Sequence, residues 1–145
     1  MKAKKFLIIN GPNLNMLGKR EPEIYGKDSM EDIISHTQEG LITENVELEW
    51  FQSNIEGEIV SRIQKAFETN KYSALIINPA GYTHTSVAIY DALLLLKCPI
   101  IEVHLTNTHK REEFRQSKLT SRAASAILEG LGKNAYLVAV KSQLL

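Results

Sequence analysis

Residues 6–13 read Phe-Leu-Ile-Ile-Asn-Gly-Pro-Asn, a run of four apolar residues followed by four turn-forming residues. Four apolar residues in succession are typical of a strand that is covered on both faces, as in a parallel sheet. The Asn-Gly-Pro-Asn that follows ends the strand with turn-forming residues that also carry polar side chains. In open α/β sheets, ligands bind beyond the carboxyl ends of the strands, where such residues would lie.

The same pattern recurs along the chain. Strands are also predicted at residues 46–51, 74–77, 100–105 and 136–140, of which 74–77 and 100–105 have, like the first, several apolar residues together. Stretches with helical spacing predict helices at residues 30–41, 55–67, 87–96 and 123–131, and the third is apolar almost all round, so we expect it to be buried. Ser29 and Asp32 resemble a capping box before the first helix. The alternation predicts a flavodoxin-like α/β fold, a doubly wound five-stranded parallel sheet of order 2-1-3-4-5.

Composition narrows the class of protein. The chain has 145 residues, of which 43% are hydrophobic and 23% charged, so residues 1–145 are expected to form one domain with a real core. Basic and acidic residues balance at 17 each, which gives no reason to expect nucleic acid or a membrane as partner. One cysteine, Cys98, excludes an internal disulfide, and no run is long enough for a signal or a membrane span, so we expect a cytoplasmic protein.

Polar residues follow the predicted strands where a doubly wound sheet would bind a ligand. Asn13 follows the first strand, and residues 52–54 follow the second. Asn78 and His84 follow the third. Glu102, His104, Thr106 and Asn107 end the fourth strand. Because these ends meet at one edge of the sheet, the sequence predicts a single site there.

Histidine carries protons near neutral pH, which makes His84 and His104 candidate acids or bases. Glu102 lies two residues before His104, so the two side chains would share one face of a strand, and the carboxylate could orient the imidazole. A histidine that a carboxylate satisfies only for packing is an equal alternative. A metal site at Glu102, His104, His109 and His84 is not expected, because no metal-binding spacing is present.

Two further segments offer charged groups. Residues 18–26, with glycine at both ends, suggest a long mobile loop in which Arg20 could lower the pKa of Tyr25 and make it a base. The alternative is a solvated arginine and a tyrosine that pins the loop. Arg111 and Arg115 lie four apart and would share one face of a short helix, holding an anion or forming ordinary salt bridges. No glycine-rich phosphate motif indicates nucleotide or flavin binding.

Together these motifs resemble the type II dehydroquinase family. The matching stretches are residues 9–18, 20–26, 51–58, 77–86, 102–107 and 111–115. They occur in order without a shift of register, and the resemblance weakens beyond residue 115, with the clearest departures at 116–129. It implies one catalytic domain and a lyase that converts 3-dehydroquinate into 3-dehydroshikimate on the route to aromatic amino acids.

The resemblance also implies a mechanism through an enolate. Tyr25 would remove a proton beside the substrate ketone as a phenolate, with Arg20 and Arg111 lowering its pKa. Asn13, through a water molecule, would stabilise the enolate, and His104 would protonate the departing hydroxyl. No cofactor and no metal would be needed.

The remaining roles follow from the same resemblance. Glu102 would orient His104. The residues implied to bind substrate are Asn78, His84, Asp91, Leu105, Thr106 and Arg115, with Asp91 reaching the site of a neighbouring subunit. The family assembles as trimers packed into dodecamers, which implies a homo-oligomer here. A catalytically silent homologue and an unrelated flavin protein are the alternatives.

Overall fold

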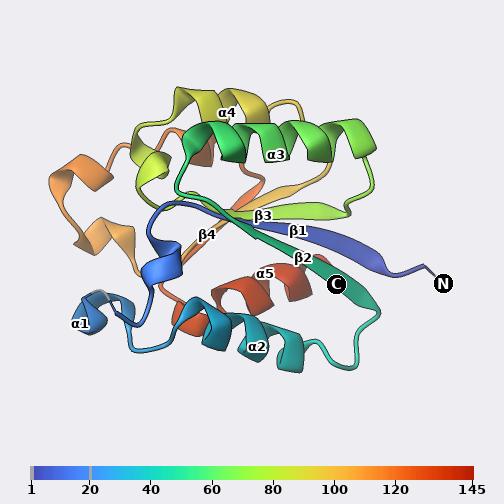
Figure 1. Cartoon of the computed structure of the whole chain (residues 1–145), viewed down its shortest axis with the longest axis horizontal. Coiled ribbons are helices and arrows are strands. Elements are labelled where there is room, and N and C mark those ends of the chain that lie inside the picture. Colours follow the sequence, from blue (N-terminus) through green and yellow to red (C-terminus); the bar gives the residue numbers. More distant parts are fainter. Residues whose placement is uncertain (1, 20) are drawn as a thin grey trace.

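The computed structural model describes residues 2–19 and 21–145, without the side chains of Pro22 and Tyr25 (Figure 1). In the described part of the chain, one sheet contains the strands β1 (Lys4–Asn10), β2 (Val46–Gln52), β3 (Ala74–Asn78), β4 (Ile100–His104) and β5 (Ala126–Glu129). All pairs are parallel and the strand order is β2-β1-β3-β4-β5. The predicted fold class and strand order are confirmed.

Helices cover both faces of this sheet. They are α1 (Pro22–Tyr25), α2 (Met30–Gly40), α3 (Glu56–Thr69), α4 (Val87–Leu93) and α5 (Ala135–Ser142). Figure 1 shows α3 and α4 on one face and α2 and α5 on the other. The predicted capping box at α2 is confirmed, because Ser29 and Asp32 each accept the other's backbone N–H. None of the helices described is both long and apolar enough to cross a membrane.

The last part of the chain differs from the prediction. Residues 136–140, predicted as the fifth strand, lie in α5, and the predicted helix at 123–131 contains β5 instead. Ala135, Tyr136, Ala139 and Val140 are all fully buried, which is the spacing of one helical face against a sheet. Residues 126–129 pair with β4 and form the edge strand, although their alanine-rich surroundings favour helix locally.

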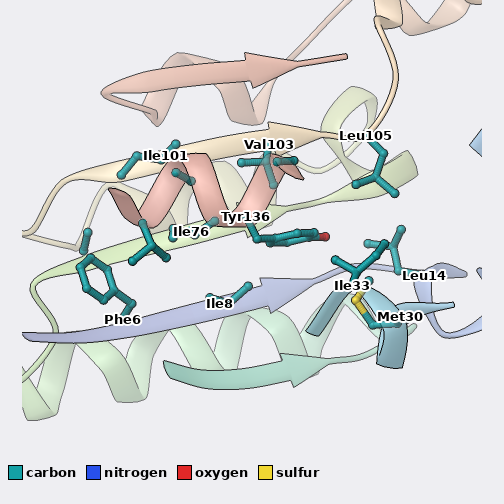
Figure 2. Packing of buried hydrophobic residues seen from close by; sticks show 14 of the residues in the cluster. Phe6, Ile8, Leu14, Met30, Ile33, Ile76, Ile101, Val103, Leu105 and Tyr136 are labelled. Carbon is teal, nitrogen blue, oxygen red and sulfur yellow. The ribbon is translucent and has the colours of Figure 1, made fainter. Parts of the chain in front are cut away.

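Successive side chains of the central strands point to opposite faces of the sheet and belong to two separate hydrophobic cores. On β1, Phe6 and Ile8 pack with α2 and α5, whereas Leu7 and Ile9 pack with α3 and α4. Figure 2 shows the first of these cores, in which Tyr136 lies among the apolar side chains with its oxygen directed toward the end where Leu14 and Leu105 lie. Burial on both faces explains the continuous apolar runs in the sequence.

The carboxyl ends of β1 and β3 are held close together. The backbone N–H of Gly11 donates to the carbonyl of Asn78 at 2.8 Å. A Cβ atom at Gly11 would lie 2.4 Å from the carbonyl oxygen of Pro79, so only glycine fits without movement. The turn that leaves β1 is thereby fixed against the turn that leaves β3, and both turns border the cavity described below.

We therefore expect Gly11→Ala to lower the free energy of unfolding by about 1–3 kcal/mol, the usual cost of forcing atoms into a packed site. Urea denaturation followed by the fluorescence of Trp50 would measure this. Gly57→Ala is the matched control, because a Cβ there meets nothing within 4 Å and lies in the first turn of α3. The control should be as stable as the parent protein or slightly more so; equal stability of the Gly11 variant would contradict the steric account.

Candidate active site

A cavity of about 150 Å³ opens at the carboxyl edge of the sheet. Its wall comes from the segments that follow β1, β3 and β4. Eight residues predicted for the site line it: Asn13, Asn78, His84, His104, Leu105, Thr106, Arg111 and Arg115. Pro12, Leu14, Leu17, Ala80, Gly81 and Thr108 complete the wall. The exits of β1, β3 and β4 therefore meet at one cavity, whereas residues 52–54, at the exit of β2, are not among the described wall residues.

Glu102 and His104 form the predicted pair on one face of β4. The Nε2 atom of His104 lies 3.0 Å from Oε2 of Glu102, and both residues are buried. A carboxylate only accepts hydrogen bonds, so Nε2 carries a hydrogen and Nδ1 is left to exchange a proton. Because His104 also lines the cavity, it can meet a ligand while Glu102 holds it from behind.

Glu102 is fully buried yet remains a carboxylate. Burial alone would raise its pKa, but hydrogen bonds from His104, Ser121 and Thr120 outweigh burial and hold the pKa below its usual value. The Thr120 hydroxyl donates to Oε1 at 2.6 Å, and the Ser121 hydroxyl donates to Oε2. A carboxylate with these donors keeps its negative charge in spite of burial and remains an acceptor for the imidazole N–H.

His84 has one defined tautomer. Its Nδ1 lies 2.8 Å from the carbonyl oxygen of Ser117, which can only accept, so Nδ1 carries the hydrogen and Nε2 is an acceptor in the neutral ring. Burial lowers the pKa of His84, and the nearby charge of Arg115 lowers it further, against the opposing effect of the Ser117 bond. At neutral pH, His84 therefore offers an acceptor to a ligand hydroxyl.

Two residues of the cavity wall adopt the left-handed backbone conformation without being glycine. They are Asn13, at φ 69°, and Ala80, at φ 53°. Asparagine tolerates this conformation, and the backbone N–H of Asn13 is held by Oδ1 of Asn54 at 2.9 Å. Ala80 is held by a hydrogen bond from its N–H to Oδ1 of Asn78 at 3.2 Å. Such conformations persist where surrounding contacts fix them, and they cluster at functional sites.

The two arginines line the cavity, but they do not share a helix. Thr108–Lys110 and Glu113–Arg115 form two separate 3-10 turns, with Arg111 between them. Nε of Arg115 lies 2.9 Å from Oε1 of Glu112, and Nε of Arg111 lies 3.3 Å from the same oxygen. The predicted helix is therefore wrong. Both arginines form salt bridges with Glu112, which was the alternative to anion binding, and both also line the cavity.

Four predicted residues are not among the described residues of the cavity wall. Arg20 lies outside the described residues, and Tyr25 ends α1 but its side chain is not described. Asp91 is exposed on α4 and is not part of the described cavity wall. Glu102 stands behind His104.

The segment from 18 to 26, predicted as a loop, contains the one-turn helix α1. Its two ends meet, since a Cβ at Gly18 would lie 3.1 Å from the carbonyl of Lys27. Gly18 and Gly26 both have positive φ, which explains the glycine at each end.

The residues that hold Glu102 and His84 were not predicted from the sequence. Thr120 and Ser121 hold Glu102, and the carbonyl of Ser117 holds His84. All three precede β5, in the part of the chain where strand and helix were exchanged. A correct position for the fifth strand would have brought this segment beside the end of β4. Among the described residues, no group of three or more His, Cys, Asp or Glu side chains is placed to hold a metal ion.

Comparison with known proteins identifies the relatives of this chain. A family model described as dehydroquinase class II matches residues 4–144. The chain is 50% identical over 133 residues to a 3-dehydroquinate dehydratase of Actinobacillus pleuropneumoniae serotype 5b, covering 92% of this chain and 85% of that protein. It is 49% identical over 138 residues to a protein of the same name from Fusobacterium nucleatum, covering 94% and 93%.

Solved structures agree with these matches. A crystal structure of type II dehydroquinase from Butyrivibrio crossotus has a TM-score of 0.94 and 40% identity, covering 99% of both chains. A type II dehydroquinase from Propionibacterium acnes has a TM-score of 0.91 and 35% identity, covering 97% of this chain and 96% of that one. The likeness extends from end to end and includes the segment after residue 115.

The lowered pKa of His84 predicts a dependence of stability on pH. The unfolded chain takes up a proton near its ordinary pKa of 6.5, before the folded protein does. The contribution of His84 to stability is therefore complete above that pH and is lost as the pH falls toward the folded pKa. His84→Asn keeps a donor for Ser117 but does not titrate. Between pH 7.5 and pH 5.5, we expect the variant to lose less unfolding free energy than the parent in urea titrations; equal losses would contradict this.

Proposed function

The chain belongs to the class II dehydroquinase family, and on this premise we propose that it dehydrates 3-dehydroquinate to 3-dehydroshikimate in the shikimate pathway. The observation that carries the proposal is the buried Glu102–His104 pair at the edge of a cavity that Arg111 and Arg115 also line. His104 supplies a proton carrier, and the two arginines supply positive charge. These groups suit a small carboxylic acid that must lose water. The whole chain acts as one catalytic domain.

The first step is removal of a proton from the carbon beside the substrate ketone. Tyr25, as a phenolate, is the proposed base, and Arg20 and Arg111 stabilise its negative charge. The bonding electrons move toward the ketone oxygen and give an enolate. Asn13, through an ordered water, stabilises that oxyanion. The cavity wall at Asn13 supports this assignment, because its backbone is fixed by Asn54 and its side chain makes no capping bond to the turn that follows.

The second step expels the hydroxyl group as water. The enolate electrons return to form the carbon–carbon double bond as the carbon–oxygen bond breaks, and His104 gives its proton to the leaving oxygen. The substrate thus loses one proton to Tyr25 and one hydroxyl, which leaves as water with the proton of His104. Before the next turnover, Tyr25 releases its proton to solvent and His104 takes one up. The negative charge of Glu102 stabilises the protonated His104 before this transfer and sets the orientation of the ring.

Binding assignments follow from the same cavity. The backbone amides of Leu105 and Thr106 hold the substrate carboxylate, and Asn78, His84 and Arg115 hold ring hydroxyls. His84 suits this role because its Nε2 is an acceptor at neutral pH, whereas the Asn78 Nδ2 atom is a donor. A hydroxyl both donates and accepts, so one acceptor and one donor are complementary to it.

The remaining proposals concern assembly and conditions. The enzyme needs no metal or other cofactor, works in the cytoplasm, and forms trimers that pack into a dodecamer. Support for assembly comes from α4 and the residues after it, where Val87 is 58% and Leu94 is 56% exposed in the isolated chain. Both residues belong to the segment 87–96, which was expected to be buried. Their exposure in the isolated chain supports a surface that another copy covers. Asp91 lies on the same helix and would reach the neighbouring site.

The direct test of the activity is a continuous ultraviolet assay with 3-dehydroquinate, following the conjugated product. We expect turnover that persists in the presence of a strong chelator and of borohydride, because neither a metal nor an imine takes part. Absence of turnover from folded protein would contradict the proposed function and favour a silent binding protein. Loss of activity on chelation would contradict the cofactor-free mechanism.

The roles of the proton carriers predict large effects on turnover. Tyr25→Phe and His104→Ala should each lower kcat by about 100-fold or more, because each removes a group that moves a proton. Circular dichroism would check that both variants fold. His36→Ala is the control, since His36 lies on α2 and bonds to Asn134. A kcat near that of the parent in either site variant would show that its role is misassigned.

The proposed assembly is tested by light scattering during size-exclusion chromatography. We expect a mass of twelve chains, and a monomer would contradict the assignment of Asp91. Asp91→Ala should lower activity without changing the mass. Mixing it with an inactive His104→Ala protein, after dissociation and reassembly, should restore part of the activity if Asp91 serves a neighbouring subunit. No recovery in mixed assemblies that have the full mass would count against that role.

A further inference from the structure

A line of buried polar groups runs from α5 to the cavity. The hydroxyl of Tyr136 lies 2.5 Å from Oδ1 of Asn10 and 3.2 Å from Nδ2 of Asn78. Tyr136 is fully buried, Asn10 is 1% exposed and Asn78 is 3% exposed. Asn10 and Asn78 are register partners at the ends of β1 and β3, and both point to the α5 face of the sheet. Of these three residues, Asn78 lines the cavity.

The direction of each hydrogen bond in this line is determined. Burial raises the pKa of Tyr136, although the bond from Asn78 opposes the shift, so the phenol keeps its single hydrogen at all ordinary pH values. At the end away from the cavity, Nδ2 of Asn10 donates to the sulfur of Met30 at 3.6 Å, which leaves Oδ1 of Asn10 as the acceptor. The phenol donates to that oxygen and must therefore accept from Asn78.

The phenol thereby fixes the amide of Asn78. Its Nδ2 must face Tyr136 and its Oδ1 must face Ala80, whose backbone N–H donates to it at 3.2 Å. The amide nitrogen has two hydrogens, and one of them is committed to the phenol, so the second remains for a ligand in the cavity. Two bonds thus fix the amide: the phenol holds its nitrogen end from the side of α5, and the Ala80 N–H holds its oxygen end.

The phenol is itself held in place. The ring of Tyr136 packs against the indole of Trp50 on β2, with centroids 5.3 Å apart and planes tilted by 57°. Figure 2 shows the ring among Ile76, Val103 and Ile33, with the oxygen at the end of the ring that points toward Leu14 and Leu105. Two of these residues, Leu14 and Leu105, also line the cavity. The hydroxyl thus reaches the underside of the cavity from a rigid apolar setting.

We infer that Tyr136 is a positioning residue for substrate binding, which acts through Asn78 by fixing the amide so that it offers an N–H to a substrate hydroxyl. The inference rests on the proposed function, in which Asn78 holds a ring hydroxyl. Because the proposed mechanism gives the substrate hydroxyl held by Asn78 no part in either proton transfer, we expect Tyr136 to affect the ground state and the transition state alike. Its removal therefore raises KM more than it lowers kcat.

The test is Tyr136→Phe, which removes one oxygen atom and keeps the ring. We expect kcat/KM for 3-dehydroquinate to fall about tenfold, the effect of one lost or misdirected hydrogen bond, with kcat changed less than about threefold. Tyr72→Phe is the matched control. Its hydroxyl also donates to one side chain, Glu49, and accepts from another, Arg62 at 2.8 Å, and it belongs to neither the cavity wall nor the line to Asn78. This control should keep the kinetics of the parent.

A double substitution separates positioning from general loss of stability. If Tyr136 acts through Asn78, adding Tyr136→Phe to Asn78→Ala should change kcat/KM less than about twofold, because the amide is already absent. A further tenfold fall in that background would overturn the inference. So would a folded Tyr136→Phe enzyme whose kcat/KM stays within twofold of the parent, or a control that falls equally.

Failure of the proposed function would be recognised separately, because the parent protein would not turn over 3-dehydroquinate at all. A crystal structure of Tyr136→Phe decides the positioning role even then. The inference expects Asn78 to turn its amide or leave its place while the backbone of β3 stays in register. An unchanged Asn78 amide, with its bond to Ala80 intact, would overturn it.

Discussion

A negative charge without access to solvent, on Glu102, is the constraint around which this active site is built. Leaving such a carboxylate without partners would be costly, so the fold surrounds it with donors. His104 comes from its own strand, and Thr120 and Ser121 come from the segment before β5. Through these bonds, Glu102 connects the segment before β5 to the centre of the site. Glu102 also holds the imidazole of His104 in position for proton transfer in the proposed reaction.

The same logic operates on the opposite face of the sheet with neutral groups. Asn10 and Asn78 end two apolar strands with amides that point into the core beneath α5. Buried amides need partners, and Tyr136 provides a donor to one and an acceptor to the other. Both faces thus end in a small polar network at the carboxyl edge, and each network leaves one group directed into the cavity, His104 from one face and Asn78 from the other.

Some elements could be predicted from the sequence because their signals are local. The apolar run of β1 and the turn at Gly11 lie within a few residues, and the Ser29–Asp32 capping box spans a single helical turn. The pairing of Glu102 with His104 follows from the alternation of side chains along one strand. The fifth strand was misplaced because β5 is a four-residue edge strand whose alanine-rich surroundings favour helix, while the apolar run of α5 is typical of a strand.

The first four strands, the polar strand exits and most residues of the cavity wall could be predicted from the sequence, because periodicity and turn chemistry act over short distances along the chain. Only the tertiary structure decided which hydroxyls hold Glu102, which tautomer His84 adopts and which way the Asn78 amide faces. These depend on partners far apart in sequence: Ser117 is 33 residues from His84, and Tyr136 is 58 residues from Asn78. A hydrogen bond has a direction that both partners must satisfy, and no local pattern records the second partner.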